Sequence, residues 1–289
     1  MRSVRKVVFP VAGLGTRMLP ATKVLPKEML PVVDKPIIQY ALEEAQAAGC
    51  EEFIFVTGRG KAMIEDHFDR AVELFQSLEA KGKTEPLETL TAEVPRAGQV
   101  LYTRQQEAKG LGHAVWCARQ LIQDEPFAVV LVDDLIHSKV PCLEQMIEAQ
   151  AQTGGNIVAV MEVVLEHTAR YGIVDPGAED GRLVEVKGLV EKPDPAAAPS
   201  RYAVIGRYIL DAEVFRHLGR HEVGAGGEIQ LTDAMEKLIG SQPFHGYRFE
   251  GERYDCGDKL GYLEAIVATA LARDDLADDF RAVLDRYRG

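Results

Sequence analysis

Residues 6–31 read KVVFPVAGLGTRMLPATKVLPKEMLP, and the architecture of the chain can be worked out from this segment. Its apolar, β-branched start, Lys6–Val11, predicts a buried strand, and Gly13 and Gly15 follow shortly after. Glycines at this place let backbone N–H groups approach an anion closely. The same loop then carries three basic side chains: Arg17, Lys23 and Lys27. Fixed positive charges beside open backbone amides predict a site for a triphosphate whose charge grows at a leaving pyrophosphate.

Two familiar nucleotide-binding motifs do not match this segment. The dinucleotide fingerprint GxGxxG fails because Met18 stands where its third glycine would be, which argues against a dinucleotide-dependent dehydrogenase. The Walker A motif fails because no Gly-Lys-Ser or Gly-Lys-Thr follows at the required spacing. The pattern that remains is GxGTR followed by TKxxPK.

Short β-branched runs alternate with helical patterns along the rest of the chain. Strands are predicted at Lys6–Val11, Glu52–Thr57, Val100–Thr103, Phe127–Val132, Asn156–Val163, Leu183–Val190, Tyr202–Leu210 and Phe244–Phe249. Helices are predicted at Ile37–Ala48, Ala62–Leu78, Gly112–Ile122, Pro141–Thr153 and Leu231–Ile239. The alternation predicts a single α/β domain over residues 1–289, with a mostly parallel sheet covered on both faces. Residues 258–287 read as a C-terminal helical segment whose apolar face suggests use in a homo-oligomer.

The composition is that of an ordinary globular protein, and the charge narrows the choice of partners. Of the 289 residues 46% are hydrophobic, and the formal net charge is −12. Nucleic acids and anionic membranes need concentrated Lys and Arg, so we expect neither as a partner. No apolar run approaches the about 20 residues of a membrane span, and Pro10 interrupts the run that would imitate a signal peptide. The four cysteines are widely spaced, which favours reduced thiols in the cytoplasm.

The longer string GLGTRMLPATKVLPKEMLPVVDKPIIQY, residues 13–40, resembles the signature of the bacterial UTP–glucose-1-phosphate uridylyltransferases. These enzymes belong to the sugar-nucleotidyltransferase superfamily, alongside the dTTP-using thymidylyltransferases. Further motifs agree in order: RQQEAKGLGHAV at 104–115, VDDL at 132–135, RYGIVD at 170–175, VEKP at 190–193, GGEIQLTDA at 226–234 and YDCGDKLGY at 254–262.

The resemblance implies both a fold and a reaction. The fold is a Rossmann-like nucleotidyltransferase fold with a mixed, mostly parallel central sheet flanked by helices, and with a nucleotide half before a sugar half. The implied substrates are UTP and glucose 1-phosphate, the implied cofactor is Mg²⁺, and the implied assembly is a homodimer or homotetramer. Thymidylyl transfer from dTTP remains an alternative, as does a non-catalytic relative that regulates an active partner.

A glutamine after the third predicted strand is the candidate for reading the base. The side-chain amide of Gln105 offers a donor and an acceptor, which matches the edge of uracil, and Gly110 would let its backbone lie against the base. From residues alone, a glutamine beside a turn is typically polar surface. The resemblance assigns to UTP binding a set of five residues: Ala12, Gly13, Gly15, Gln105 and Gly110. His113 and Trp116 are expected to be helix-start and packing residues.

A continuously apolar strand, Phe127–Val132, ends in two aspartates, Asp133 and Asp134. Acidic residues at the carboxyl end of a buried parallel strand lie where open α/β sheets bind ligands, and carboxylates are the oxygen ligands that Mg²⁺ accepts. The resemblance puts the metal on Asp133 and on Asp255 of the YDCG motif. The strand here ends in Val-Asp-Asp where many relatives have Pro-Asp, so the choice between Asp133 and Asp134 stays open. We expect Asp134 to point to the opposite side of the strand end.

The VEKP motif supplies the candidates for the sugar phosphate. A carboxylate beside an ammonium can accept sugar hydroxyls while the lysine holds the phosphate. The resemblance gives these roles to Glu191 and Lys192, with Gly172 and the backbone of Val204 lining the hexose. The implied reaction is an in-line attack that needs no general base, and its catalytic residues would be Arg17, Lys27 and Lys192.

Overall fold

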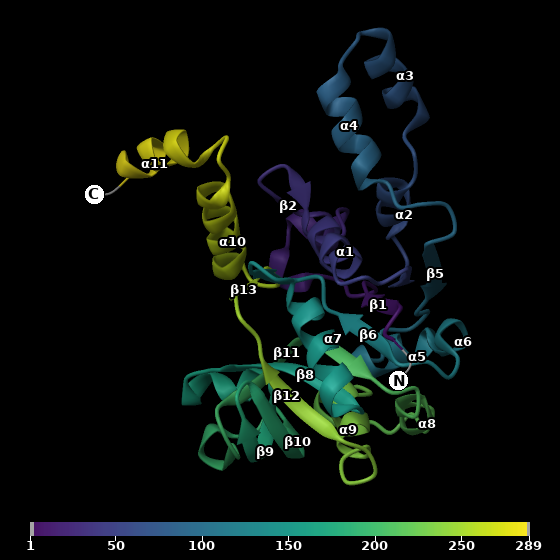
Figure 1. The fold of residues 1–289 in the computed structure, drawn as a ribbon, viewed down its shortest axis with the longest axis vertical. Coiled ribbons are helices and arrows are strands. Elements are labelled where there is room, and N and C mark those ends of the chain that lie inside the picture. The colour runs from purple at the N-terminus through teal and green to yellow at the C-terminus, as the bar shows by residue number, and fades with distance from the viewer. Residues whose placement is uncertain (1–2, 288–289) are drawn as a thin grey trace.

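The computed structural model describes residues 3–287, and its framework is one nine-stranded sheet (Figure 1). The strands lie in the order β5-β4-β1-β6-β11-β8-β12-β10-β9. In that order their bounds are Val100–Arg104, Glu52–Thr57, Lys6–Pro10, Phe127–Val130, Tyr202–Leu210, Asn156–Glu162, Phe244–Arg248, Leu183–Glu191 and Gly172–Asp180. Each predicted strand is therefore present, within two residues at either end.

The sheet is mixed, as the sequence predicts, but parallel pairing is confined to part of it. Strands β5, β4, β1 and β6 pair only in parallel with one another. On the other side β11 runs antiparallel to both β6 and β8, and β10 runs antiparallel to β9 and β12. The prediction of a mostly parallel sheet is wrong for this second half, where only β8 and β12 are parallel. For β9 and β10 the physical reason is the tight turn at Gly181, which joins the two strands directly and leaves no room for a crossover.

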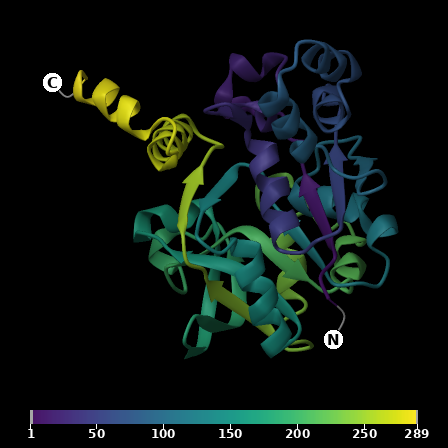
Figure 2. The same cartoon turned by 45° about the horizontal axis from the view of Figure 1, so that its top comes forward.

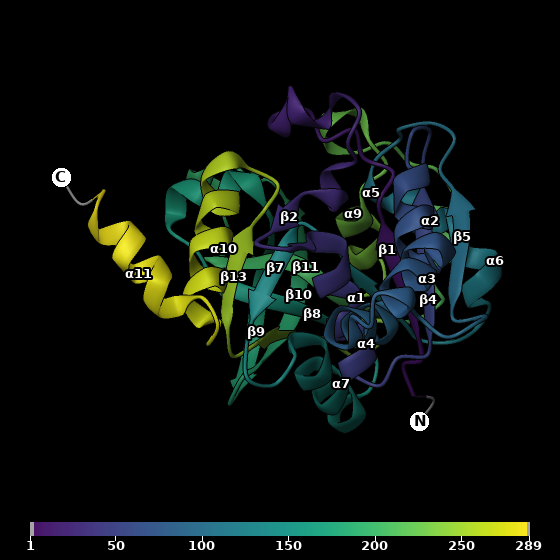
Figure 3. The same ribbon diagram turned by 90° about the horizontal axis from the view of Figure 1, so that it is seen from above.

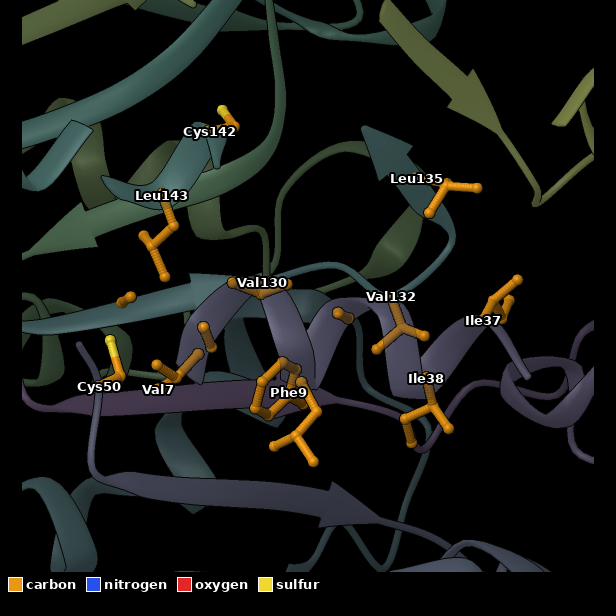
Figure 4. Close-up of a cluster of buried hydrophobic side chains, with 14 of the residues drawn as sticks. Val7, Phe9, Ile37, Ile38, Cys50, Val130, Val132, Leu135, Cys142 and Leu143 are labelled. Carbon is orange, nitrogen blue, oxygen red and sulfur yellow. The ribbon is translucent and has the colours of Figure 1, made fainter. Parts of the chain in front are cut away.

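Helices cover both faces of the sheet and define two hydrophobic cores. Alternate residues of β1 point to opposite faces, so Val7 and Phe9 belong to one core and Val8 to the other. The first core is closed by α1 (Ile37–Ala47) and α7 (Cys142–Thr153), and Figure 4 shows their side chains gathered with those of β1. The second is closed by α5 (Leu111–Cys117), α8 (Val214–Leu218) and α9 (Leu231–Glu236).

Two of the predicted helices are broken in the structure. The predicted helix Ala62–Leu78 is split into α2 (Ala62–Phe68) and α3 (Val72–Ala80), because the chain is extended at Asp69. The predicted helix Gly112–Ile122 is likewise split into α5 and the short α6 (Arg119–Ile122). A further helix, α4 (Thr84–Glu93), was not predicted, since it buries no residue and has no apolar stripe to reveal it. Helices α3 and α4 project together from the body of the molecule (Figure 1).

A second, two-stranded sheet joins distant parts of the sequence. It pairs β7 (Asp134–His137) with β13 (Glu252–Asp255), antiparallel, with Asp134 opposite Asp255. The chain then forms α10 (Lys259–Ala272) and α11 (Ala277–Asp285), so the predicted terminal segment is helical but interrupted. Figures 2 and 3 show α11 extending away from the sheet. No helix in residues 3–287 combines the length and the apolar composition that a bilayer crossing requires.

The loop between β1 and α1 contains only short elements. Three turns of 3₁₀ helix, Thr16–Met18, Ala21–Lys23 and Lys27–Met29, carry its basic side chains. A small hairpin follows, made of β2 (Pro31–Val32) and β3 (Lys35–Pro36). The loop therefore leaves the carboxyl end of β1, which is where ligands bind in open α/β sheets.

Candidate active site

A cleft lies where the parallel half of the sheet meets the antiparallel half. Its lining includes seven of the residues singled out from the sequence: Arg17, Asp133, Gly172, Glu191, Lys192, Val204 and Asp255. The remaining ones, Ala12, Gly13, Gly15, Lys27, Gln105 and Gly110, lie at the loops that follow β1 and β5 on the parallel side. Residues from five separate motifs thus meet at one opening.

Asp133 and Asp255 approach each other because the sheet of β7 and β13 ties their segments together. The backbone N–H of Cys256 donates to the carbonyl of Asp133 at 2.7 Å, which closes this link. Gly257 lies between the two carboxylates: a Cβ on it would stand 3.0 Å from an oxygen of each. The same position is 3.7 Å from a guanidinium nitrogen of Arg17. Two carboxylates and one guanidinium therefore surround one small space.

Lys27 completes this cluster of charges. Its Nζ lies 2.5 Å from Oδ2 of Asp133, and its stem runs under the glycine turn. Gly15 has φ +65°, and a Cβ there would be 3.0 Å from Cβ of Lys27, so both the backbone and the space require glycine. Burial opposes ionisation of Asp133, but the Lys27 ammonium, a backbone hydrogen bond and the charge of Arg253 together outweigh burial and hold the pKa of that carboxyl below its usual value. Asp133 is therefore an ionised carboxylate that is already paired with the Lys27 ammonium.

Asp134 has a different environment from its neighbour. Its Oδ2 accepts a hydrogen bond from the backbone N–H of Gly206 at 2.7 Å, and its Oδ1 is ion-paired with Arg253. The side chain is buried, although it also contributes to the cleft lining beside Asp133. Because protein donors occupy both oxygens, the geometry favours Asp133 over Asp134 as the carboxylate offered to a ligand.

Two buried ion pairs hold the loops that carry these groups. Glu28, next to Lys27, accepts a hydrogen bond from Nζ of Lys61 at 2.6 Å, with both side chains almost fully buried. Arg207 on β11 pairs with Glu44 on α1 and donates to the carbonyl oxygens of Leu131 and Asp134. Neither pair was predicted from the sequence, because each joins residues far apart in the chain. Together they fix the basic loop and the Asp133 loop to the framework.

The opposite wall of the cleft carries the VEKP motif. Lys192 has φ +46°, and its Nζ lies 3.1 Å from Oε1 of Glu191. The other oxygen of Glu191 accepts a hydrogen bond from the Thr232 hydroxyl at 2.7 Å, a contact that the sequence did not predict. Gly172 faces the same pair, since a Cβ there would stand 3.3 Å from Glu191. Val204 lies on β11 beside them in the cleft lining.

Gln105 and Gly110 form a separate corner at the end of β5. The backbone N–H of Gln105 donates to Thr57, and its side-chain Nε2 donates to the carbonyl of Gly110 at 3.1 Å. Gly110 has φ +96° and packs so closely on Ile229 that a Cβ would lie 2.9 Å from its carbonyl oxygen. Ala12 closes the neighbouring turn, because a Cβ on Gly58 would meet its carbonyl oxygen at 3.2 Å. These contacts leave this corner lined largely by backbone.

The donor set suits Mg²⁺ better than a metal held by protein alone. No group of three or more His, Cys, Asp or Glu side chains suitable for a metal occurs in residues 3–287. Mg²⁺ usually takes one or two carboxylates together with phosphate oxygens and water. Asp133 and Asp255, separated only by Gly257, supply that number.

Comparison with known proteins identifies the family of this chain. The model of the family described as "Nucleotidyl transferase" matches residues 6–271, nearly the whole chain. The chain belongs to the nucleotidyltransferase family. Within it, a curated relative from Komagataeibacter xylinus, named UTP–glucose-1-phosphate uridylyltransferase, is 55% identical over 260 residues, 90% of this chain and 92% of the relative.

Two solved nucleotidyltransferases have the same fold. UTP-bound UGPase from Acinetobacter baumannii has a TM-score of 0.90 at 40% identity, covering 97% of this chain and 98% of that one. A UDP-glucose pyrophosphorylase complexed with UDP-glucose has a TM-score of 0.83 at 42% identity, covering 93% of this chain and all of the other. The family predicted from the motifs is therefore confirmed, and so is the nucleotidyltransferase fold with its mixed sheet.

Proposed function

We propose that this nucleotidyltransferase transfers the uridylyl group of UTP to α-D-glucose 1-phosphate, giving UDP-glucose and pyrophosphate. The observation that carries the proposal is the division of the cleft. One group of side chains in or beside the cleft, Arg17, Lys27 and two carboxylates, suits a triphosphate, and a second group, Glu191 and Lys192, suits a sugar phosphate; we assign the two groups to two walls of the cleft. The relatives support it, since their names and titles give UTP, glucose 1-phosphate and UDP-glucose.

The reaction in this proposal is a direct displacement. A phosphate oxygen of glucose 1-phosphate forms a bond to the α-phosphorus of UTP, the bond from that phosphorus to the bridging oxygen breaks, and pyrophosphate leaves. A phosphate dianion needs no base to remove a proton, so positioning and charge neutralisation carry the catalysis. Arg17 and Lys27 bind the β- and γ-phosphates and stabilise the charge that grows on the leaving group.

The second substrate is oriented from the opposite wall. Lys192 holds the attacking phosphate, and Glu191, fixed by Thr232, accepts hydroxyls of the hexose while Gly172 and the Val204 backbone line the ring. Asp133 and Asp255 would hold Mg²⁺. Bound there, Mg²⁺ supplies positive charge to the phosphate oxygens. On the base side, Gln105 and the backbone of Ala12, Gly13 and Gly110 contact uracil, with Gly15 keeping the turn open above Lys27.

Thymidylyl transfer is the nearest competing function, and regulation without catalysis is another. Retention of Arg17, Lys27, Asp133, Lys192 and Asp255 argues against a non-catalytic relative. Release of pyrophosphate should be measured with UTP, dTTP, CTP and ATP, each paired with glucose 1-phosphate and with other hexose 1-phosphates. The highest kcat/KM for UTP with glucose 1-phosphate is expected. A higher value for dTTP would replace the proposal, and no release from any pair would favour the regulatory function.

The proposal extends to a single-domain cytoplasmic homo-oligomer in which the C-terminal segment contacts a second copy. Leu260 and Leu263 of α10 are 77% and 58% exposed, and α11 buries none of its residues. Light scattering on the full chain and on the double substitution Leu260→Glu, Leu263→Glu tests the point. A dimer or tetramer that dissociates in the variant supports this interface, and an unchanged mass would place the interface elsewhere.

A further inference from the structure

The amide of Gln105 is held in one orientation by two acceptors. Its Nε2 lies 3.1 Å from the carbonyl oxygen of Gly110 and 3.0 Å from Nδ1 of His113. A carbonyl oxygen can only accept a hydrogen bond, so the amide atom that faces Gly110 must be the nitrogen. The second hydrogen of that nitrogen then points to His113, whose Nδ1 must present a lone pair.

This arrangement decides what Gln105 has left to offer. Both hydrogens of Nε2 are used inside the protein, and no donor within residues 3–287 pairs with Oε1. Gln105 therefore faces a ligand as a hydrogen-bond acceptor alone. The N3–H group of uracil matches an acceptor, whereas N3 of cytosine is itself an acceptor and would be repelled. Thymine has the same N3–H as uracil, so this contact does not separate UTP from dTTP.

His113 can accept this hydrogen bond because its surroundings fix the ring and keep it neutral. Its imidazole stacks on Trp116 with ring centroids 5.9 Å apart, and the Arg119 guanidinium lies over the same indole at 3.5 Å. Burial lowers the pKa of His113, and His221, Lys109 and Arg119 lower it further against a smaller opposite effect of Glu107. A neutral ring with a proton on Nε2 leaves Nδ1 free to accept from Gln105.

We propose that His113 is a positioning residue for base selection, which aligns the Gln105 amide so that only its oxygen faces the nucleobase. The proposal rests on the proposed function, in which Gln105 contacts uracil. It gives a role to a histidine that the sequence alone suggested was a packing residue. His113 acts through Gln105 and touches neither the phosphates nor the sugar, so its effect should fall on base preference.

Three variants test the proposal through the ratio of kcat/KM for UTP to that for CTP. His113→Leu removes the acceptor, and His113→Asn keeps an oxygen close to the position of Nδ1. His217→Leu is the matched control, because it removes another half-buried imidazole whose Nδ1 has no protein partner within residues 3–287. We expect the ratio to fall by about tenfold in His113→Leu and to stay within about threefold of the parent in the other two.

The pH dependence of this ratio provides a second measurement. Protonated His113 cannot accept from Gln105, and burial lowers its pKa below the ordinary value of about 6.5, so the same ratio should fall only at pH values below about 6.5. The triphosphate groups of UTP and CTP titrate alike, whereas N3 of cytosine also takes up a proton in acid; this second effect is common to the parent and to His113→Asn, so the difference between the two profiles reports His113. His113→Asn should lose only the part of the dependence that His113 causes, because its amide does not titrate.

The outcomes distinguish a failure of the His113 proposal from a failure of the proposed function on which it rests. A parent that prefers UTP, with the same ratio in a folded His113→Leu, would overturn the role of His113 alone. Identical pH profiles of the ratio in the parent and in His113→Asn, followed down to the lowest pH at which both stay folded, would do the same even if His113→Leu failed to fold. A parent that shows no UTP turnover would instead refute the proposed function.

Discussion

Two adjacent aspartates belong to two different layers of the molecule. Asp133 lies at the cleft with one partner, Lys27, and both side chains remain about a quarter exposed. Asp134 belongs to a buried layer in which its carboxylate pairs with Arg253, while Arg207 pairs with Glu44 and donates to the backbone carbonyl of Asp134. The buried layer has its donors and acceptors paired within the protein, whereas the cleft layer keeps groups that a ligand can engage. The difference teaches that chain position does not separate a structural charge from one exposed to the cleft. Asp255 combines the two, because it lines the cleft yet accepts from the Gly257 N–H and is ion-paired with Arg170 and Arg253.

The largest effect should come from the buried layer. Asp134→Ala leaves Arg253 as a buried charge without its main partner and the Gly206 N–H without an acceptor, at a cost of about 3–5 kcal/mol in the free energy of unfolding. Urea denaturation measures this loss. Asp278→Ala, which removes a fully exposed ion-paired aspartate, is the control and should leave the curve unchanged. Equal urea denaturation curves for the two variants would show that Asp134 stabilises the fold no more than an exposed aspartate does.

The cleft layer should show the reverse pattern. Asp133→Asn keeps the size of the side chain but removes the charge offered to Mg²⁺, so kcat should fall by about 10²–10³-fold. Its denaturation curve should move far less than that of Asp134→Ala, and added Mg²⁺ should recover part of the activity. Steady-state kinetics over a range of Mg²⁺ concentrations checks this. Full activity at low Mg²⁺ would remove Asp133 from the metal site.

The opposite wall of the cleft should respond to one substrate only. Lys192→Ala removes a charge-assisted contact to the sugar phosphate, so KM for glucose 1-phosphate should rise and kcat should fall, together about 2–4 kcal/mol. KM for UTP serves as the internal control and should hardly change. If UTP binding weakens instead, Lys192 belongs with Arg17 and Lys27, and the division of the cleft into two walls fails.

The smallest of these effects is expected at the base. Gln105→Ala leaves the uracil edge partly unpaired, which should weaken UTP binding by about 1–3 kcal/mol. Calorimetric titration with UTP, dTTP and CTP measures it, with glucose 1-phosphate KM in saturating UTP as the control. Equal weakening for all three triphosphates would mean that Gln105 shapes the loop and does not read the base.

The strands of the nine-stranded sheet were predictable from the sequence because local residue patterns mark them. Strands such as Glu52–Thr57 and Tyr202–Leu210 match their predicted bounds, since short apolar runs rich in β-branched and aromatic residues mark buried strands directly. The mixed sheet was implied by the family resemblance alone, because strand direction depends on which strands pair, and alternation of elements does not encode pairing. Strands β7 and β13 are four residues each and lack a clear pattern of their own.

The candidate site was predictable only where motifs carry it. Asp133, Asp255 and Lys192 were named from short strings, and the structure brings all three to one cleft. The supporting residues Thr232 and Arg253 could not be predicted in this way, because they act through contacts with residues far away in the chain. Such contacts leave no periodicity and no spacing in a single sequence, so only the fold can supply them.

The pairing of β7 with β13 also bears on how the protein is made. Asp133 is synthesised well before Asp255 and β13, the strand that draws Asp255 in. Contacts between such distant residues form late, after the loop between them has been closed. The parallel strands β1, β4, β5 and β6 all precede Asp133 in the growing chain, so they can pair before Asp255 has been made. A product truncated before Asp255 would lack one of the two carboxylates proposed to hold Mg²⁺, and we expect it to be inactive.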